Sequence, residues 1–413
     1  MSKFKSIFNS LNYGDQSELI WYYHLWSKIS GVKILLIPLK FFDFKGKRIF
    51  YNNLGNYELF NCISDYTIDN FFLKKILILG KYIQIILYLF IFFLKKIFFS
   101  FRKKNIWDTF KKRYENNEIY HPNPLHVVYK SDLYFPYKNL IKNYKKIKSD
   151  KTLLNNLNFR LTEKNFKYCD ESLKKLLDFD YKKKFIILHV REGNFHQDQN
   201  IPQGYVRNAK IKNYIPSIKY FIDKGYKIVR LGDEGMERIT GMDYLGNNFI
   251  DYAHLDVKKK KKIYELFFIQ NCEFFFGSNS GVVETSRLFG KRLVVSNIFP
   301  DWSWAMTNNT DIGIIKKTKF SSNILSPFEQ IDLHLNVILN QGWKGFRDKK
   351  FELIDNSEDE ILELAKSSLS KKPNMSDAAI RYNKYRIKKV LHFLNSYSIS
   401  VDGRGKPIKH WKK

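Results

Sequence analysis

Cysteine is scarce in this sequence: Cys62, Cys169 and Cys272 are the three cysteines among 413 residues. They lie far apart and form neither a C-x-x-C pair nor a zinc-type spacing with histidine. This usage argues against a small disulfide-stapled fold and against a structural zinc site, and it fits a reducing, cytoplasmic compartment. We therefore expect no metal cofactor.

Several catalytic motifs are also missing. The sequence has no G-x-x-x-x-G-K-[ST] loop, no G-x-G-x-x-G after a strand, and no H-E-x-x-H. These absences disfavour P-loop nucleotidases and zinc proteases. The stretch "GSNSG" at 277–281 has Asn279 at its centre, where a nucleophile elbow would carry serine. An esterase is therefore disfavoured.

The sequence lacks an apolar run long enough to span a bilayer comfortably. The N-terminus has no signal-peptide pattern. The most apolar segment, 71–104, contains an uncharged run of only thirteen residues, 82–94, and lysines bracket it. A bilayer span needs roughly 20 residues. We expect a helix lying on an anionic membrane, peripheral to the inner face of the cytoplasmic membrane. A buried helix pair and a single strained span are the alternatives.

Acidic residues are in the minority, with 41 Asp and Glu against 71 Lys and Arg and a formal net charge of +30. Such a surface attracts nucleic acid, anionic lipid or phosphorylated substrates. A general compositional bias toward lysine is the alternative explanation. Because the basic residues are spread along the chain, they indicate no specific nucleic-acid-binding module.

What is present is an alternation of strand and helix patterns. At the start, a strand pattern at 5–11 precedes a helix pattern with Ser17 as N-cap and Gly31 after its end, and a second strand follows. From residue 181 the alternation is regular and the strands are nearly all apolar, which predicts a parallel sheet covered on both faces. The predicted strands are 184–190, 226–233, 248–255, 272–281 and 291–298, and the helices are 207–225, 258–271 and 281–290.

Polar groups follow each of these strands. Parallel strands gather their carboxyl ends at one edge of the sheet, where α/β folds bind ligands. The groups expected at this edge are His189, Arg191, Glu192, Arg230, Gly232, Asp233, Asp251, Tyr252, His254, Gly277, Ser278, Asn279, Ser280, Gly281, Glu284, Ser296 and Asn297.

These groups suit a nucleotide diphosphate. The 277–281 loop precedes a helix, so its backbone N–H groups and the helix dipole favour phosphate oxygens. Arg191 adds a bidentate cationic contact. Glu284 or Asp233 can accept bonds from the ribose or base. An ordinary turn at 277–281 and a surface pair of His189 with Arg191 are the alternatives.

The segments "LHVREGNF", "RNAKIKNYIPSIKYFIDKGYKIVRLGD", "IDYAH" and "FFFGSNSGVVETSRLFG" resemble a bacterial family of surface-polysaccharide glycosyltransferases. That family is similar to the fucosyltransferase-like enzymes, whose hallmark is His-x-Arg. The resemblance covers about residues 180–300. It implies a GT-B fold, in which two Rossmann-like domains face each other across a cleft. Residues 1–180 would be the acceptor side, 181–350 would bind the nucleotide sugar, and 351–413 would form C-terminal helices and a basic tail.

By that resemblance, Arg191 binds the donor diphosphate, the 278–281 loop holds phosphate or ribose, and His189 supports Arg191 or the sugar. The enzyme would transfer a sugar from a nucleotide-sugar donor to a glycan or lipid-linked acceptor, without a metal. Asp15 is the candidate general base, with helix capping as its alternative role. Glu192 departs from the fucosyltransferase pattern, which puts GDP-fucose specificity in doubt. The alternative function is a non-catalytic nucleotide- or nucleic-acid-binding protein.

Overall fold

The computed structural model describes residues 159–192, 206–299, 310–341 and 350–370 without interruption. Outside these ranges it describes 4–8, 17, 20–21, 31, 33–37, 58–59, 62–63, 75–76, 79–80, 83, 86–87, 90, 345–346, 377–378, 380–382, 384–386 and 388–389.

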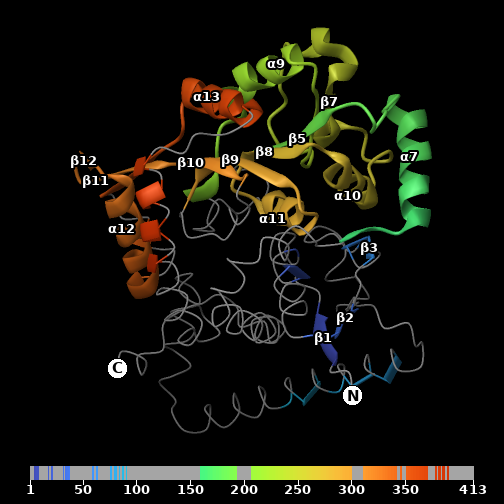
Figure 1. The fold of residues 1–413 in the computed structure, drawn as a ribbon, viewed down its shortest axis with the longest axis horizontal. Coiled ribbons are helices and arrows are strands. Elements are labelled where there is room, and N and C mark those ends of the chain that lie inside the picture. The colour runs from blue at the N-terminus through green and yellow to red at the C-terminus, as the bar shows by residue number, and fades with distance from the viewer. Residues whose placement is uncertain are drawn as a thin grey trace, which may run out of the picture.

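The central element is a six-stranded parallel sheet with the order β10-β9-β8-β5-β6-β7 (Figure 1). This confirms the predicted α/β class and the parallel sheet. The strands are β5 (Phe185–His189), β6 (Lys227–Arg230), β7 (Phe249–Asp251), β8 (Phe274–Ser278), β9 (Arg292–Ile298) and β10 (Ile312–Ile315).

Helices cover both faces of this sheet, which explains the unbroken apolar strands. Successive residues of β5 enter opposite cores: Ile187 joins one cluster, and Ile186 and Leu188 join the other. The first core is closed by α7 (Glu163–Leu177), α10 (Lys262–Asn271) and α11 (Gly281–Leu288). The second is closed by η3 (Ile211–Tyr214), α9 (Ile215–Asp223) and α13 (Glu358–Leu369). Figure 1 shows α9 and α13 on the opposite side of the sheet from α10 and α11.

Helix α7 lies before the domain boundary that we predicted at residue 180. Its Cys169 and Leu173 are fully buried in the same core as Phe275 of β8. Asp178 caps its C-terminus at φ 48°, and the Asp180 carboxylate accepts a 3.0 Å hydrogen bond from the Lys182 N–H group. Asp178 therefore ends the helix through its backbone, and the Asp180 carboxylate closes the turn that follows.

A small antiparallel sheet follows the central one. Its order is β12-β11-β13, formed by Asn323–Ile324, Lys317–Phe320 and Phe351–Ile354. Helix α12 (Pro327–Gln341) belongs to a third core, which contains Ile331, Leu335, Val337, Phe299 and Phe346. We did not predict this sheet from the sequence.

The described N-terminal elements include a parallel pair, β1 (Phe4–Phe8) and β2 (Lys33–Ile37), and an antiparallel pair, β3 (Cys62–Ile63) with β4 (Arg160–Leu161). Gly31 has φ +68°, the left-handed conformation expected just after a helix. These elements fit the predicted strand-helix-strand pattern.

Ser17, Ile20 and Trp21 connect this N-terminal part to the central domain. Ser17 is helical, and its hydroxyl lies 2.6 Å from the hydroxyl of Thr285 on α11. Trp21 is 1% exposed, and the guanidinium of Arg287 lies 4.2 Å from its ring centroid. Hydroxyl pairing and cation–π contact therefore hold this segment against α11.

No helix in the described part of the chain is both long and apolar enough to cross a membrane.

Candidate functional site

The strand order creates a topological switch point between β5 and β8. From β5 the chain proceeds to β6 and β7 on one side, and then returns to build β8, β9 and β10 on the other. Loops leaving the carboxyl ends of β5 and β8 therefore diverge, and doubly wound folds bind ligands in the crevice between them. His189 and Arg191 follow β5, and the loop 278–281 follows β8. The structure thus brings together the two motifs that carried the sequence argument.

The two strand ends approach each other very closely. The N–H group of Arg191 donates a 2.7 Å hydrogen bond to the Ser278 hydroxyl. Gly277 has φ +156°, and a Cβ atom there would lie 1.9 Å from the carbonyl oxygen of His189. Glycine is therefore required at this position, since any side chain would push β8 away from β5.

Among the described residues, the Arg191 guanidinium has no ion-pair partner. Its Nε atom is buried and has no hydrogen-bond partner. Burial, and then the nearby positive charge of Arg207, lower the pKa of the Arg191 guanidinium to about 9. In the described part of the structure no carboxylate forms an ion pair with it. An anion held here would offset both the desolvation and the repulsion.

The loop after β8 presents a helix N-terminus to the same edge. Ser280 is the N-cap of α11 with extended backbone, φ −146° and ψ 174°, and its side chain makes no capping bond. Its hydroxyl is buried and unpartnered. The first-turn N–H groups therefore lack a side-chain cap, as in helix ends that receive an anion. Neighbouring Asn279 is occupied structurally, because its amide donates a 3.1 Å bond to the Phe299 carbonyl.

His189 has a positioning role. Its Nδ1 lies 3.0 Å from the carbonyl oxygen of Leu231, so Nδ1 carries the proton and donates. Burial lowers the pKa of His189 to about 4, so the ring is neutral at pH 7. The histidine thus ties the end of β5 to the residue that follows β6.

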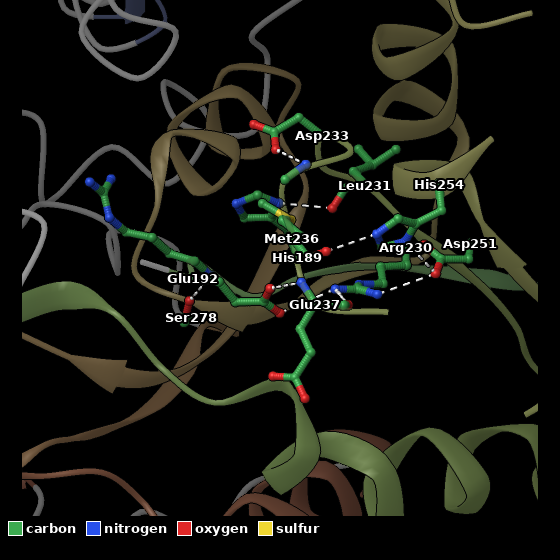
Figure 2. Close-up of polar contacts among 12 residues, drawn as sticks. His189, Glu192, Arg230, Leu231, Asp233, Met236, Glu237, Asp251, His254 and Ser278 are labelled. Carbon is green, nitrogen blue, oxygen red and sulfur yellow. Dashed lines mark hydrogen bonds and ion pairs between the residues drawn. The ribbon is translucent and has the colours of Figure 1, made fainter. Parts of the chain in front are cut away.

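Glu192 belongs to a buried ion network, which Figure 2 shows beside the ends of β5, β6 and β7. The fully buried guanidinium of Arg230 lies 3.1 Å from Glu192 Oε1 and 3.2 Å from Asp251 Oδ2. It also donates a 2.7 Å bond to the Glu237 carbonyl. His254 Nδ1 lies 2.8 Å from Asp251 Oδ2. Burial raises the pKa of Glu192, which the positive charge of Arg230 opposes.

Sequence reasoning missed this network, although each member had been placed at the sheet edge. The signal was available: the strand ends of β5, β6 and β7 carry Glu192, Arg230 and Asp251, which are oppositely charged residues on neighbouring strands. Glu192 had drawn attention only as a departure from a family pattern. In the structure its carboxylate pairs with the Arg230 guanidinium.

The remaining predicted residues have the following settings. A Cβ on Gly232 would lie 2.2 Å from Met236 Sδ. The Asp233 carboxylate accepts a 3.0 Å bond from the Gly235 N–H group, an Asx-type turn. Glu284 pairs with Arg287 one helical turn later. Asp15 lies outside the described residues. Asp15 as general base therefore stays a prediction.

Among the described residues, no group of three or more His, Cys, Asp or Glu side chains is arranged to hold a metal ion. Cys169 and Cys272 are buried, and burial raises the pKa of each thiol to about 12.

Comparison with known proteins found similarity to a different class. The chain is 28% identical over 150 residues to the phenylalanine--tRNA ligase beta subunits of two strains of Campylobacter jejuni. The alignment covers 32% of this chain, and the chain spans only 19% of the length of these curated relatives. No protein-family model matches the chain, and no solved structure matches it significantly.

The prediction of glycosyl transfer is wrong. The similarity to a tRNA ligase subunit favours nucleotide or nucleic-acid binding, which was the alternative. The error has a physical source: a phosphate-binding sheet edge is shared by many nucleotide-using proteins, and it does not encode which group, if any, is transferred.

Proposed function

We propose that the six-stranded domain binds a nucleotide, with its phosphates at the switch point between β5 and β8. The observation that carries this proposal is the Arg191 guanidinium, whose Nε is buried and unpartnered beside the like charge of Arg207. A phosphate bound next to this cation is stabilised by two separate effects. The anion removes the repulsion between the arginines and supplies the missing hydrogen-bond acceptor.

The geometry of the strand ends supports the same ligand. The Ser278 hydroxyl fixes the backbone of Arg191 next to the uncapped N-terminus of α11. Phosphate oxygens bound there accept hydrogen bonds from the backbone N–H groups of the first turn, and the helix dipole favours the negative charge of the phosphate. The similarity to a tRNA ligase subunit over about a third of the chain agrees with a nucleotide-binding role.

Nucleic acid is the second candidate ligand. The same similarity favours it, and so does the net charge of +30. Lys258, Lys259, Lys261 and Lys262 are exposed in the connection between β7 and α10. Such lysines bind a phosphate backbone as point charges, with a strong dependence on salt concentration.

A second Rossmann-like domain facing the first across a cleft also stays a proposal. The parallel register of β1 with β2, joined through the helical Ser17, Ile20 and Trp21, supports it.

The test is a thermal-shift screen of the full chain with ADP, GDP, UDP, CDP and inorganic pyrophosphate. At about 100 times its dissociation constant, a ligand that binds only the folded state adds about 2.7 kcal/mol of stability. At least one nucleotide should raise Tm, and Arg191→Ala should abolish the rise. Arg160→Ala, at an exposed arginine of β4, is the matched control and should keep it.

Three results would contradict the proposal. In the first, no nucleotide raises the Tm of the wild-type protein. In the second, a nucleotide raises the Tm of the Arg191→Ala variant as much as that of wild type. In the third, random oligonucleotides bind while free nucleotides do not. The last result, with steep salt dependence, would establish the second candidate.

A further inference from the structure

The helical positions described between residues 75 and 90 form an exposed apolar face. We name it the apolar stripe, and its six large side chains are between 49% and 63% exposed: Ile76, Leu79, Ile83, Ile86, Leu87 and Phe90. Gly80 lies among them, and a Cβ atom there would meet no atom within 4 Å. Soluble proteins seldom leave so continuous an apolar surface uncovered, so it indicates an interaction site.

The spacing of these residues gives the stripe a defined shape. The intervals of three and four residues from Ile76 to Phe90 place all six on one arc of about 100° at a helical period of 3.6 residues. The stripe is about 21 Å long at 1.5 Å rise per residue. This geometry suits a helix that lies flat on a surface with one side buried.

The positive charge of the segment distinguishes between two possible binding surfaces, a second copy of this chain and an anionic bilayer. The segment 71–104 contains eight Lys and Arg and no Asp or Glu, in a chain of net charge +30. Lys75, exposed and adjacent to Ile76, is one of these cations. A second copy of this chain would bring the same positive charge to the interface, which opposes association. An anionic bilayer offers both an apolar interior for the stripe and a negative surface for the lysines.

We propose that the apolar stripe docks this protein on an anionic lipid bilayer, parallel to its surface. The six side chains enter the boundary between head groups and acyl chains, and the cations of the segment contact lipid phosphates and carboxylates. The stripe does not include the nucleotide-binding residues, so this surface is independent of the proposed function.

The experiment is flotation of the full chain with two kinds of vesicle: phosphatidylcholine alone, and an equimolar mixture of phosphatidylcholine and phosphatidylserine. Wild type should float with the mixed vesicles and much less with the neutral ones. The double variant Leu79→Asp, Ile86→Asp should lose about tenfold or more of this binding, since each substitution replaces buried apolar surface with a charge. Because both side chains are exposed, the melting temperature should not change.

The matched control is Ile324→Asp. Ile324 on β12 is 63% exposed, as is Ile86, and this variant should float like wild type. Sedimentation velocity of wild type without lipid completes the design. The proposal is overturned if wild type does not float, if the double variant floats equally, or if wild type forms a dimer that the double variant dissociates. The last result would assign the stripe to a second copy.

Discussion

At the residue scale, Gly277 is the tightest constraint on the sheet edge. Its φ angle is +156°, and a Cβ atom added at this position would lie 1.9 Å from the His189 carbonyl oxygen. The ends of β5 and β8 are thereby held together without an intervening side chain. The requirement comes from backbone sterics, so it does not depend on which ligand is bound.

We predict that Gly277→Ala lowers the free energy of unfolding by about 3 kcal/mol or more, because the strands must separate to accept a methyl group. Chemical denaturation measures this. Gly290→Ala is the control: Gly290 has φ +68° but open space around a Cβ, so it should cost only about 1–2 kcal/mol. Equal costs for the two variants would show that the close approach of β5 and β8 is wrong.

His189 should make stability depend on acid pH. Its pKa is about 4 in the folded protein and about 6.5 unfolded, so the unfolded chain binds more protons between these values. Stability therefore rises with pH across this window and is lost as pH falls from about 6.5 toward 4. We predict that His189→Asn reduces the slope between about pH 5 and 6 by about 1.2 kcal/mol per pH unit. Urea denaturation at several pH values tests this. An unchanged slope would mean that His189 titrates normally.

At this scale the sequence indicated which residues reach the sheet edge but not their partners. Arg191 and Ser278 were expected there, and they meet through a backbone hydrogen bond. Glu192 and Glu284 were assigned by family pattern or ligand chemistry, yet each pairs with a nearby arginine. Such pairing depends on strand order and rotamers, which the local sequence does not contain.

At the element scale, a strand could be located from the sequence when both of its faces are buried. Strands β5, β6, β8 and β9 are short apolar runs with turn signals, so the pattern located them well. Strands β11 and β13 were missed because lysine, threonine and glutamate interrupt their apolar positions. Helix α10 begins at Lys262, four residues later than expected, because Lys258 and Lys259 lie in a turn and Lys261 has extended backbone.

The start of α13 offers a prediction about a single element. The Ser357 hydroxyl accepts from the Glu360 N–H group, and the Glu360 carboxylate accepts from the Ser357 N–H group, which makes a capping box. Ser357→Ala should lower stability by about 1 kcal/mol. Ser367→Ala, at an exposed position of the same helix, should be neutral or slightly stabilising because alanine favours helix. Thermal unfolding compares the two. A neutral Ser357→Ala would contradict the capping geometry.

At the scale of the whole molecule, α11 links the sheet edge to the N-terminal part of the chain. One end of this helix faces the proposed phosphate site, and its Thr285 and Arg287 contact Ser17 and Trp21. The proposed phosphate site and the packing of the N-terminal segment therefore share one element.

We predict that Trp21 and Arg287 are energetically coupled. In a double-mutant cycle with Trp21→Leu and Arg287→Met, the coupling free energy should be about 1–2 kcal/mol, since the buried guanidinium lies over the ring. The cycle is measured by chemical denaturation. Additive effects would show that the N-terminal segment does not pack on α11.

The molecular scale is also where sequence reasoning about function failed. The switch point could be predicted, because ordered strand ends and a helix N-terminus have local signals. The class of reaction could not, since it depends on groups that meet the nucleotide from outside the sheet. The sequence similarity to a tRNA ligase subunit overturned the prediction of glycosyl transfer.

We propose that phosphate binds between Arg191 and the N-terminus of α11. The most direct test is an NMR titration of isotope-labelled full chain with pyrophosphate and with the nucleotide that gives the largest thermal shift. The amide signals of Arg191, Gly281 and Val282 should move together with one dissociation constant, and Arg191→Ala should remove these shifts. Shifts confined to the lysines 258–262, or unaffected by Arg191→Ala, would contradict the account.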